Sequence, residues 1–325
     1  MMFDNNRTYA FLPSLLAALC WGAMFPIAAA AVGHVDAFHL TAVRYVVATL
    51  IFLALLAAVE GRRALRADGR GLELFALGTL GFAGFNLLTY VALEHTRPQD
   101  AALIVATAPL LTALAVWLTA RQAPSKATLT AMAVALLGVM LVISRGDPST
   151  LIHGQGRASD LLVLAGVLSF VAYTLGARRF PQFSPLRYTA LSAAGGTLTI
   201  LAVTVLVTLT GAYPLPSAGD WGAAWLEVAY IIVFGALVGV LAWNAGVRRI
   251  GPANGALFMN LVPIVTFAIE IGRGYRPGTV ELSGALLTIA ALVGANVAGR
   301  GYAIRRPSRL AWAATRAAKA AKSLP

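Results

Sequence analysis

The sequence predicts an all-α integral membrane protein in which ten transmembrane helices form two inverted five-helix repeats. Three observations lead to this prediction. Of the 325 residues, 59% are apolar and only 12% are charged, whereas soluble domains carry about 45–50% apolar and about 25% charged residues. Uncharged stretches long enough to cross a bilayer recur along the whole chain. Finally, parts of the first half of the chain recur in the second half.

Each predicted helix is an apolar stretch of about 20 residues, the length that spans the hydrocarbon core of a bilayer. Short segments rich in Gly, Pro or charged residues separate the stretches. The first stretch is longer than the apolar segment of a cleaved secretory signal, so we expect it to be retained. The ten predicted helices cover residues 9–32, 38–59, 72–93, 99–119, 126–143, 160–178, 186–210, 223–247, 252–271 and 280–302.

The longest connection, at residues 144–159, is polar and divides the chain into two halves. The first repeat then covers residues 9–143 and the second covers residues 160–303, between a short N-terminal segment at 1–8 and a basic tail at 304–325. The tail could lie on the membrane surface as an amphipathic segment, or it could be a disordered basic retention signal.

The formal net charge of +12 comes largely from basic residues that lie between the apolar stretches or in the tail. With a cytoplasmic N-terminus, most of the 25 Lys and Arg residues fall on the cytoplasmic side, as the positive-inside rule requires. We therefore expect a multi-pass plasma membrane protein, in a bacterial inner membrane, with both termini in the cytoplasm. The charge then directs topology and attracts anionic lipid of the bilayer, so we expect no nucleic acid as partner.

A sequence repeat relates the two halves. Aligning Pro98 with Pro252 also places Pro109 on Pro263, together with pairs of Ala, Leu and Thr residues. Because five helices are an odd number, the second half must enter the membrane from the opposite side to the first. Two inverted halves around a shared site can expose that site first to one side and then to the other. The repeat therefore predicts a carrier.

Short motifs inside the predicted helices carry a family resemblance. They are Leu19-Cys20-Trp21-Gly22, Ala42-Val43-Arg44-Tyr45, Tyr90-Val91-Ala92-Leu93, Ser169-Phe170-Val171-Ala172-Tyr173, residues 252–263 and Gly284-Ala285-Leu286-Leu287. With them the chain resembles the EamA family of the drug/metabolite transporter superfamily over residues 9–303. The resemblance implies export or uptake of small metabolites, amino acids among them, through a central cavity. Many members have a Gly-Glu pair some way beyond each repeat proline. At those positions, beyond Pro109 and Pro263, this chain has Ala120-Arg121-Gln122 and Gly274-Tyr275-Arg276 instead.

Polar and aromatic side chains in the middle of the predicted helices are the candidate substrate-binding residues. Burying a polar side chain without a partner costs about 1–3 kcal/mol, so such residues either bind a solute or hold helices together. As a set they could line one cavity for an apolar or zwitterionic small-molecule substrate. The candidates are Trp21, Asn86, Tyr90, Thr107, Tyr173, Trp243, Asn244 and Asn260.

Two prolines are candidate hinges. Pro109 and Pro263 each remove one helical hydrogen bond, which frees the carbonyl groups of Val105 and Met259. The paired kinks could bend between two states of a carrier, or they could serve packing alone.

Arg44 is the only full charge well inside a predicted span, on its outer side. It could bind a substrate carboxylate, or it could pair with Glu94, Glu227 or Glu270 near the outer surface. Alternatively, its long side chain could extend to the outer membrane interface. The predicted bilayer centre contains no carboxylate, which favours facilitated over proton-coupled transport.

Other functional classes find little support in the sequence. No helix carries a His-Glu-x-x-His or Gly-x-Ser-x-Gly motif, and Cys20 is the single cysteine, so we expect no enzyme, metal or cofactor. A channel needs a ring of repeated polar residues, which the candidates do not form. A passive facilitator remains the alternative to a carrier. The sequence leaves open the substrate, the direction of transport, and whether the chain is a monomer or a homodimer.

Overall fold

The computed structural model describes residues 10–120, 126–145, 147 and 157–305. All regular elements in these ranges are helical, so the predicted all-α class is confirmed. The N-terminal segment, most of the 144–159 linker, most of the basic tail and Arg121-Gln122 lie outside the described residues.

The described helices coincide with the ten predicted stretches. Eight are long and apolar enough to cross a membrane, and two shorter apolar helices, Leu129–Ser144 and Thr279–Ala291, complete the set. The first half consists of α2 (Leu12–Val32), α3 (Ala37–Val59), η1 (Arg62–Leu65), α4 (Gly71–Gly78), η2 (Thr79–Gly84), α5 (Phe85–Leu93), α6 (Pro98–Val105), α7 (Ala108–Ala120) and α8 (Lys126–Ser144).

The second half repeats the order of the α-helices and of the π-helical segment, with one added surface helix, α12, and with its short 3-10 helices at other places. Its elements are α10 (Arg157–Gly176), η3 (Ala177–Arg179), α11 (Pro185–Leu209), α12 (Ala218–Ala223), α13 (Trp225–Tyr230), η4 (Ile231–Val238), α14 (Gly239–Ile250), α15 (Pro252–Ala256), η5 (Leu257–Asn260), α16 (Leu261–Gly272) and α17 (Thr279–Arg305).

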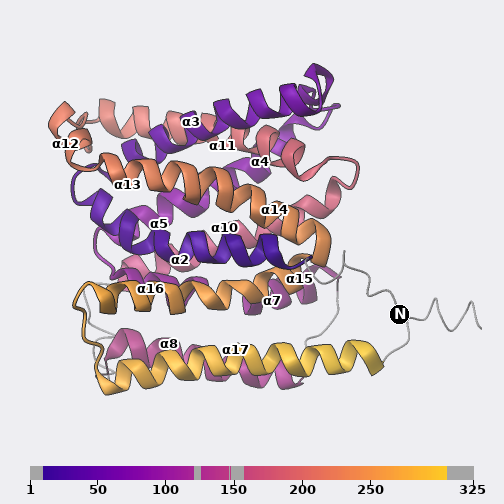
Figure 1. Cartoon of the computed structure of the whole chain (residues 1–325), viewed down its shortest axis with the longest axis vertical. Helices are drawn as coiled ribbons and strands as arrows, with labels where there is room; N and C mark the ends of the chain where they lie inside the picture. The colour runs from indigo at the N-terminus through magenta and orange to yellow at the C-terminus, as the bar shows by residue number, and fades with distance from the viewer. Residues whose placement is uncertain (1–9, 121–125, 146, 148–156, 306–325) are drawn as a thin grey trace, which may run out of the picture.

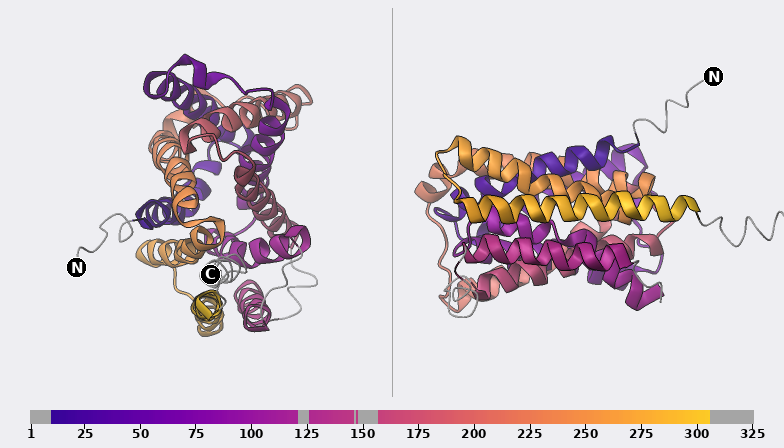
Figure 2. Two further views of the ribbon diagram at one scale, coloured as in Figure 1. Left: turned by 90° about the vertical axis from the view of Figure 1, so that its right-hand side faces the viewer. Right: turned by 90° about the horizontal axis from the view of Figure 1, so that it is seen from below.

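Packing between the halves follows an inverted symmetry. Helix α2 packs on η4 and α14 of the second half, and α10 packs in the same way on η2 and α5 of the first half. The related helices α3 and α11 pack on each other, and Thr49 Oγ1 lies 2.8 Å from Thr197 Oγ1 across this contact. Helices α8 and α17 form a second such pair at one edge of the bundle (Figures 1 and 2). Each contact thus recurs with the halves exchanged.

The third and eighth spans contain matching irregularities. Both α4–α5 and α13–α14 are interrupted by π-helical segments, η2 and η4 respectively. Segments of this kind open the regular hydrogen-bond ladder and occur often at functional sites. Small residues let the neighbours approach here: a Cβ at Gly81 would lie 2.4 Å from Tyr173 Cγ, and one at Gly235 would lie 2.7 Å from Met24 Sδ.

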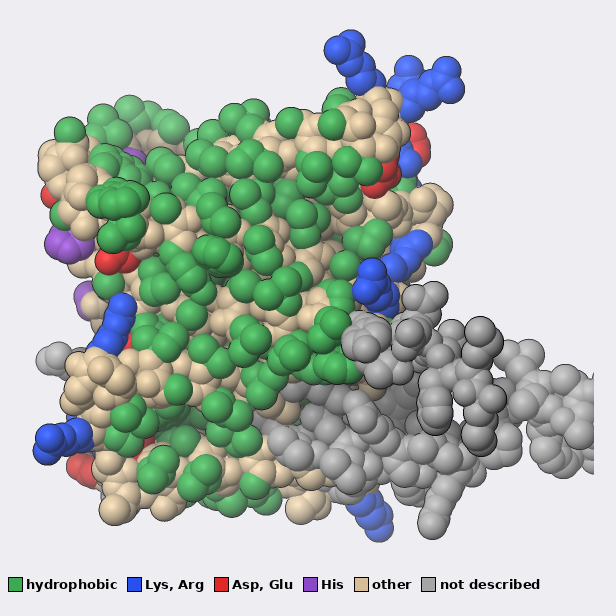
Figure 3. All heavy atoms as spheres, in the orientation of Figure 1, with side chains coloured by type: hydrophobic (Ala, Val, Ile, Leu, Met, Phe, Trp, Pro, Cys, Tyr) green, Lys and Arg blue, Asp and Glu red, His purple; other side chains and the backbone are tan. Residues whose placement is uncertain are grey.

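The two ends of the bundle differ in charge. We call the end formed by η1, η3 and the last turn of α14 the basic end, because most Lys and Arg residues of the described loops lie there. The opposite end comprises residues 33–36, 94–97, 210–224 and 273–278. In Figure 3 apolar side chains cover the face between the ends, while charged side chains lie at the two ends. This arrangement is the one expected of a bundle that crosses a bilayer.

Candidate functional site

Arg44 lies inside the bundle and donates hydrogen bonds to two of the predicted site residues. Its Nη1 donates to Asn86 Oδ1 at 2.7 Å and to Tyr90 Oη at 2.6 Å, and its Nη2 lies 3.4 Å from Met24 Sδ. Asn86 and Tyr90 are four residues apart on α5, so both side chains lie on the helix face that meets α3. We call these four residues, Arg44, Asn86, Tyr90 and Met24, the arginine cluster.

The structure does not support two of the predictions made for Arg44, namely extension to the membrane interface and pairing with a glutamate. Arg44 is 1% exposed, so its side chain does not extend to the membrane interface. Among the described residues, none of the expected partners Glu94, Glu227 and Glu270, and no other carboxylate, lies within 4.0 Å of its guanidinium. The face of α3 that carries Arg44 turns inward onto α5 and η4, which explains both results.

A second polar group, without charge, lies nearer the basic end. Asn244 Nδ2 donates to Tyr173 Oη at 2.8 Å and to Thr189 Oγ1 at 2.7 Å. Tyr188 donates from its hydroxyl to the Tyr173 carbonyl at 2.8 Å, and the two rings stack at 5.2 Å. We call Tyr173, Tyr188, Thr189 and Asn244 the asparagine cluster. In the repeat Asn244 occupies the position of Tyr90, so the two clusters are related by the inverted symmetry.

Aromatic rings fill the space between the two clusters. The centroids of Trp21, Phe170 and Trp243 lie 5.5–5.6 Å from one another. Trp21 Nε1 donates to the Gly235 carbonyl at 2.9 Å. Trp243 Nε1 donates to Thr174 Oγ1 at 3.3 Å. The predicted residues Trp21 and Trp243 thus form a packed aromatic core with satisfied indole N–H groups.

A second row of rings connects the asparagine cluster to Arg44. Tyr173 packs on Phe82 at 5.3 Å, and Phe82 packs on Tyr45, also at 5.3 Å. The Arg44 guanidinium lies 4.8 Å from the Tyr45 ring centroid, within the range of a cation–π contact. A continuous row of ring contacts therefore joins the asparagine cluster to Arg44.

The remaining predicted residues lie at breaks in the fourth and ninth spans. Thr107 lies between α6 and α7 and donates to the Ile104 carbonyl at 2.6 Å. Asn260 ends η5, and its buried Oδ1 has no hydrogen-bond partner among the described residues. Pro109 and Pro263 follow these breaks by two or three residues, at corresponding places in α7 and α16. Within the part of the chain described, no side-chain hydrogen bond joins Thr107 or Asn260 to either cluster.

A cavity of about 370 Å³ opens at the basic end and reaches the asparagine cluster. Of the predicted residues, Asn244 alone lines it. Tyr188 and Thr189 were missed by sequence reasoning, although Thr189 aligns with Thr41 in a weaker part of the repeat. The wall of the cavity consists of Ala177, Arg178, Phe180, Pro181, Phe183, Ser184, Pro185, Tyr188, Asn244, Val247 and Arg248.

The opposite end is joined by an ion-pair network around Arg97. Arg97 Nε lies 2.7 Å from Asp100 Oδ2, and Arg97 Nη1 lies 3.0 Å from Glu281 Oε1. The Tyr275 hydroxyl lies 2.5 Å from Glu281 Oε1 and 2.9 Å from Arg97 Nη1. Burial and the neighbouring Glu281 carboxylate raise the pKa of Tyr275, so its hydroxyl stays protonated as a donor. The network connects the fourth span to α17.

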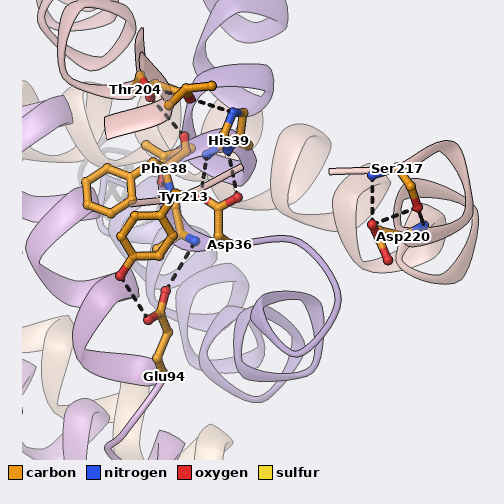
Figure 4. Close-up of polar contacts among 11 residues, drawn as sticks. Asp36, Phe38, His39, Glu94, Thr204, Tyr213, Ser217 and Asp220 are labelled. Carbon is orange, nitrogen blue, oxygen red and sulfur yellow. Dashed lines mark hydrogen bonds and ion pairs between the residues drawn. The ribbon is translucent and has the colours of Figure 1, made fainter. Parts of the chain in front are cut away.

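A second set of contacts at this end joins the loop before α12 to the first half (Figure 4). Tyr213 donates from its hydroxyl to Glu94 Oε2 at 3.4 Å, and its ring packs on Phe38 at 4.7 Å. His39 Nδ1 lies 2.7 Å from Asp36 Oδ2, and its Nε2 lies 3.1 Å from Thr208 Oγ1 of α11. The contacts of Tyr213 and of Thr208 cross between the halves, so they help to hold the opposite end together.

Comparison with known proteins assigns this architecture to a family. The sequence model of the EamA-like transporter family matches residues 8–144 and again residues 157–297. The chain belongs to the EamA-like transporter family. This family is part of the drug/metabolite transporter superfamily, and the EamA-like chain is accordingly a multi-pass membrane transporter.

Relatives of this EamA-like transporter carry transporter names. "Uncharacterized transporter YrdR" of Bacillus subtilis (strain 168) is 30% identical over 290 residues, 88% of this chain and 90% of YrdR. A second relative in that organism, "Uncharacterized transporter YyaM", is 29% identical, over 85% of this chain and 89% of YyaM. A "Probable terminal-alkyne amino-acid exporter" of Streptantibioticus cattleyicolor is 24% identical, over 91% of this chain and 96% of the exporter.

One solved crystal structure has the same fold. It superposes on this EamA-like transporter with a TM-score of 0.65 and 22% sequence identity, and the match covers 90% of this chain and 99% of the other. At this identity the likeness concerns the fold alone.

Proposed function

We propose that this EamA-like transporter moves a small metabolite, an amino acid or a related solute, across the plasma membrane by alternating access between its two halves. The observation that carries the proposal is the pair of symmetry-related buried polar clusters, of which one borders a cavity and the other is enclosed. In a carrier built from inverted repeats, exchanging the conformations of the halves would exchange these two environments.

The basic end faces the cytoplasm in this proposal, as do both termini. The support comes from the Lys and Arg residues of the loops, which are concentrated at that end. The cavity that reaches Asn244 then opens to the cytoplasm, and the contacts around Arg97 and Glu94 close the outer side. The amino-acid class is supported by the name of the Streptantibioticus relative. The aromatic core between the clusters would suit an apolar side chain.

Counterflow in proteoliposomes tests the proposal. Vesicles loaded with unlabelled phenylalanine or leucine should accumulate the labelled amino acid transiently, and initial uptake should saturate. A passive facilitator gives uptake without counterflow, and that result contradicts the carrier. No uptake of any amino acid in a panel of twenty contradicts the amino-acid class.

A matched pair of variants connects the transport to the site. Asn244→Ala removes the donor shared by Tyr173 and Thr189, and we expect roughly tenfold slower uptake at low substrate because about 1–1.5 kcal/mol of hydrogen bonding is lost. Asn254→Ala changes the same residue type at an exposed position near the basic end and should transport normally. An equal loss of uptake in the two variants would show that the asparagine cluster has no specific role in transport.

A further inference from the structure

Arg44 brings a full positive charge into the interior of the bundle, where the described residues supply no counter-charge. The described residues place no carboxylate within 4.0 Å of its guanidinium. Two polar neighbours and two aromatic rings surround it instead. Buried charges are normally paired, because the interior cannot solvate them as water does. The interior therefore holds one positive charge that an anion could neutralise.

The hydrogen bonds of Arg44 leave one edge of its guanidinium free. Nη1 has two oxygen acceptors, Asn86 and Tyr90. Nε is buried and has no partner within the described structure, and Nη2 meets only the Met24 sulfur, which is a weak acceptor. The N–H groups of Nε and Nη2 point in the same direction and form one of the edges that bind a carboxylate through two parallel hydrogen bonds.

A backbone irregularity lies beside this free edge. Gly235 belongs to the π-helical segment η4, and a Cβ built on it would lie 3.2 Å from Arg44 Nη2. The carbonyl of Gly235 is occupied by Trp21 Nε1, so this backbone does not supply the missing acceptor. A larger side chain at position 235 would press on Nη2 and on Met24, whereas glycine leaves the approach to this edge narrow but uncovered by a side chain.

The related cluster in the other half carries no charge. Asn244, Tyr173, Tyr188 and Thr189 offer amide and hydroxyl groups only. A solute held between the clusters would therefore meet one cation, neutral hydrogen-bonding groups and aromatic rings. A monoanion would leave the filled site neutral, whereas a zwitterion or an amine would leave uncompensated positive charge in a poorly solvated region.

We propose that the Nε/Nη2 edge of Arg44 binds the carboxylate of the transported solute, and that the preferred solutes are monocarboxylates with an apolar or aromatic body. This inference rests on the proposed transport function and names its substrate class. In the present structure the row of Tyr188, Tyr173, Phe82 and Tyr45 rings separates the cavity from Arg44. The carboxylate reaches Arg44 when these rings move apart during the transport cycle.

A matched set of probes tests the proposal on the wild-type chain. Thermal unfolding of the purified protein in detergent is measured with 3-phenylpropionate, 3-phenylpropionamide, phenylalanine and phenethylamine. We expect 3-phenylpropionate to raise the unfolding temperature most and phenylalanine less, with no shift from the amide or the amine. Equal stabilisation by 3-phenylpropionate and 3-phenylpropionamide would overturn the proposal. The absence of a shift with both 3-phenylpropionate and phenylalanine would also overturn it.

Two variants locate the binding at Arg44. Arg44→Gln should weaken binding of 3-phenylpropionate about 10- to 150-fold, the usual effect of losing hydrogen bonds to a charged group. Gly235→Ala keeps the charge but crowds Nη2, and it should weaken the same acid severalfold. Gly222→Ala is the control, because a Cβ at Gly222 meets nothing within 4 Å. Undiminished acid binding by Gly235→Ala overturns the proposal even where Arg44→Gln does not fold.

Transport assays separate failure of this inference from failure of the proposed function. Saturable counterflow of phenethylamine or another solute without a carboxylate would leave the transport function standing and overturn the carboxylate site. Binding of 3-phenylpropionate that depends on Arg44 but produces no counterflow would support the site and contradict the carrier.

Discussion

Ion pairs cross between the halves at both ends of the bundle, and the basic end also contains a cavity. At the opposite end, ion pairs around Arg97 and the contact of Tyr213 with Glu94 join distant spans. At the basic end, a cavity of about 370 Å³ enters between η3, α11 and α14 and reaches Asn244. The basic end is also crossed by ion pairs between the halves, since Arg187 Nη2 lies 2.7 Å from Asp68 Oδ2 and Arg179 Nη2 lies 3.6 Å from Glu73 Oε2. The cavity, rather than a lack of contacts between the halves, therefore distinguishes this end.

The largest expected effect comes from removing the cation of the opposite-end network. Arg97→Gln leaves the Asp100 and Glu281 carboxylates, whose side chains are 9% and 4% exposed, without their shared partner. We expect a loss of about 3 kcal/mol in the free energy of unfolding, because breaking a buried ion pair strands the remaining charge. Chemical or thermal unfolding in detergent measures this loss.

Arg273→Gln serves as the control for that variant. Arg273 also pairs with a glutamate, Glu270, but at 3.6 Å and with 48% of its side chain exposed. Exposed pairs contribute at most about 1 kcal/mol, so the control should unfold close to wild type. Similar losses in the two variants would show that the Arg97 network does not hold the opposite end.

Thiol labelling compares the accessibility of the two ends directly. In a Cys20→Ser background, a cysteine replacing Ala177 lines the cavity at the basic end. A cysteine replacing Leu93, which is 5% exposed at the opposite end, should react with a water-soluble maleimide at least about tenfold more slowly, because labelling needs local opening. Equal rates would mean that both ends are open in solution. Repeating the assay with Arg97→Gln should raise the Leu93→Cys rate selectively.

The smallest expected effect concerns the hydroxyl of Tyr213. Tyr213→Phe removes a 3.4 Å contact to Glu94 and should cost less than about 1 kcal/mol. Burial, together with the Glu94 carboxylate, raises the pKa of Tyr213, so the hydroxyl remains protonated in the folded protein up to and beyond its usual range. The difference in unfolding temperature between wild type and variant should stay constant below about pH 10 and shrink above it. A difference that changes between neutral pH and about pH 9 would contradict this assignment.

Much of the fold could be predicted from the sequence, because a bilayer requires each spanning helix to be an apolar stretch of about 20 residues, and such stretches can be counted along the chain. The stretch at 72–93 predicted a span that the structure places at Gly71–Leu93. The π-helical segment within it was not predictable, since the apolar pattern is the same for either backbone. The repeat alignment of Pro109 and Pro263 indicated corresponding breaks, and both occur just ahead of these prolines.

The sequence predicted which residues belong to the candidate site better than it predicted how they contact one another. Asn86 and Tyr90 were expected on one face of a helix, and Arg44 was expected inside a span. That these three side chains contact one another depends on the rotation of α3 against α5, which no local pattern specifies. The contact between Arg97 and Glu281 was also invisible in the sequence, because it joins residues 184 positions apart.

The sequence by itself determined that this chain crosses a membrane in ten helices and that its halves are inverted, because backbone groups in lipid must bond within each helix and an odd helix number reverses the second repeat. The tertiary structure alone decided which polar side chains meet, which end contains the cavity, and that no carboxylate of the described residues lies beside Arg44. Those outcomes depend on how helices from distant parts of the chain rotate and pack, and hydropathy along the chain carries no record of that rotation.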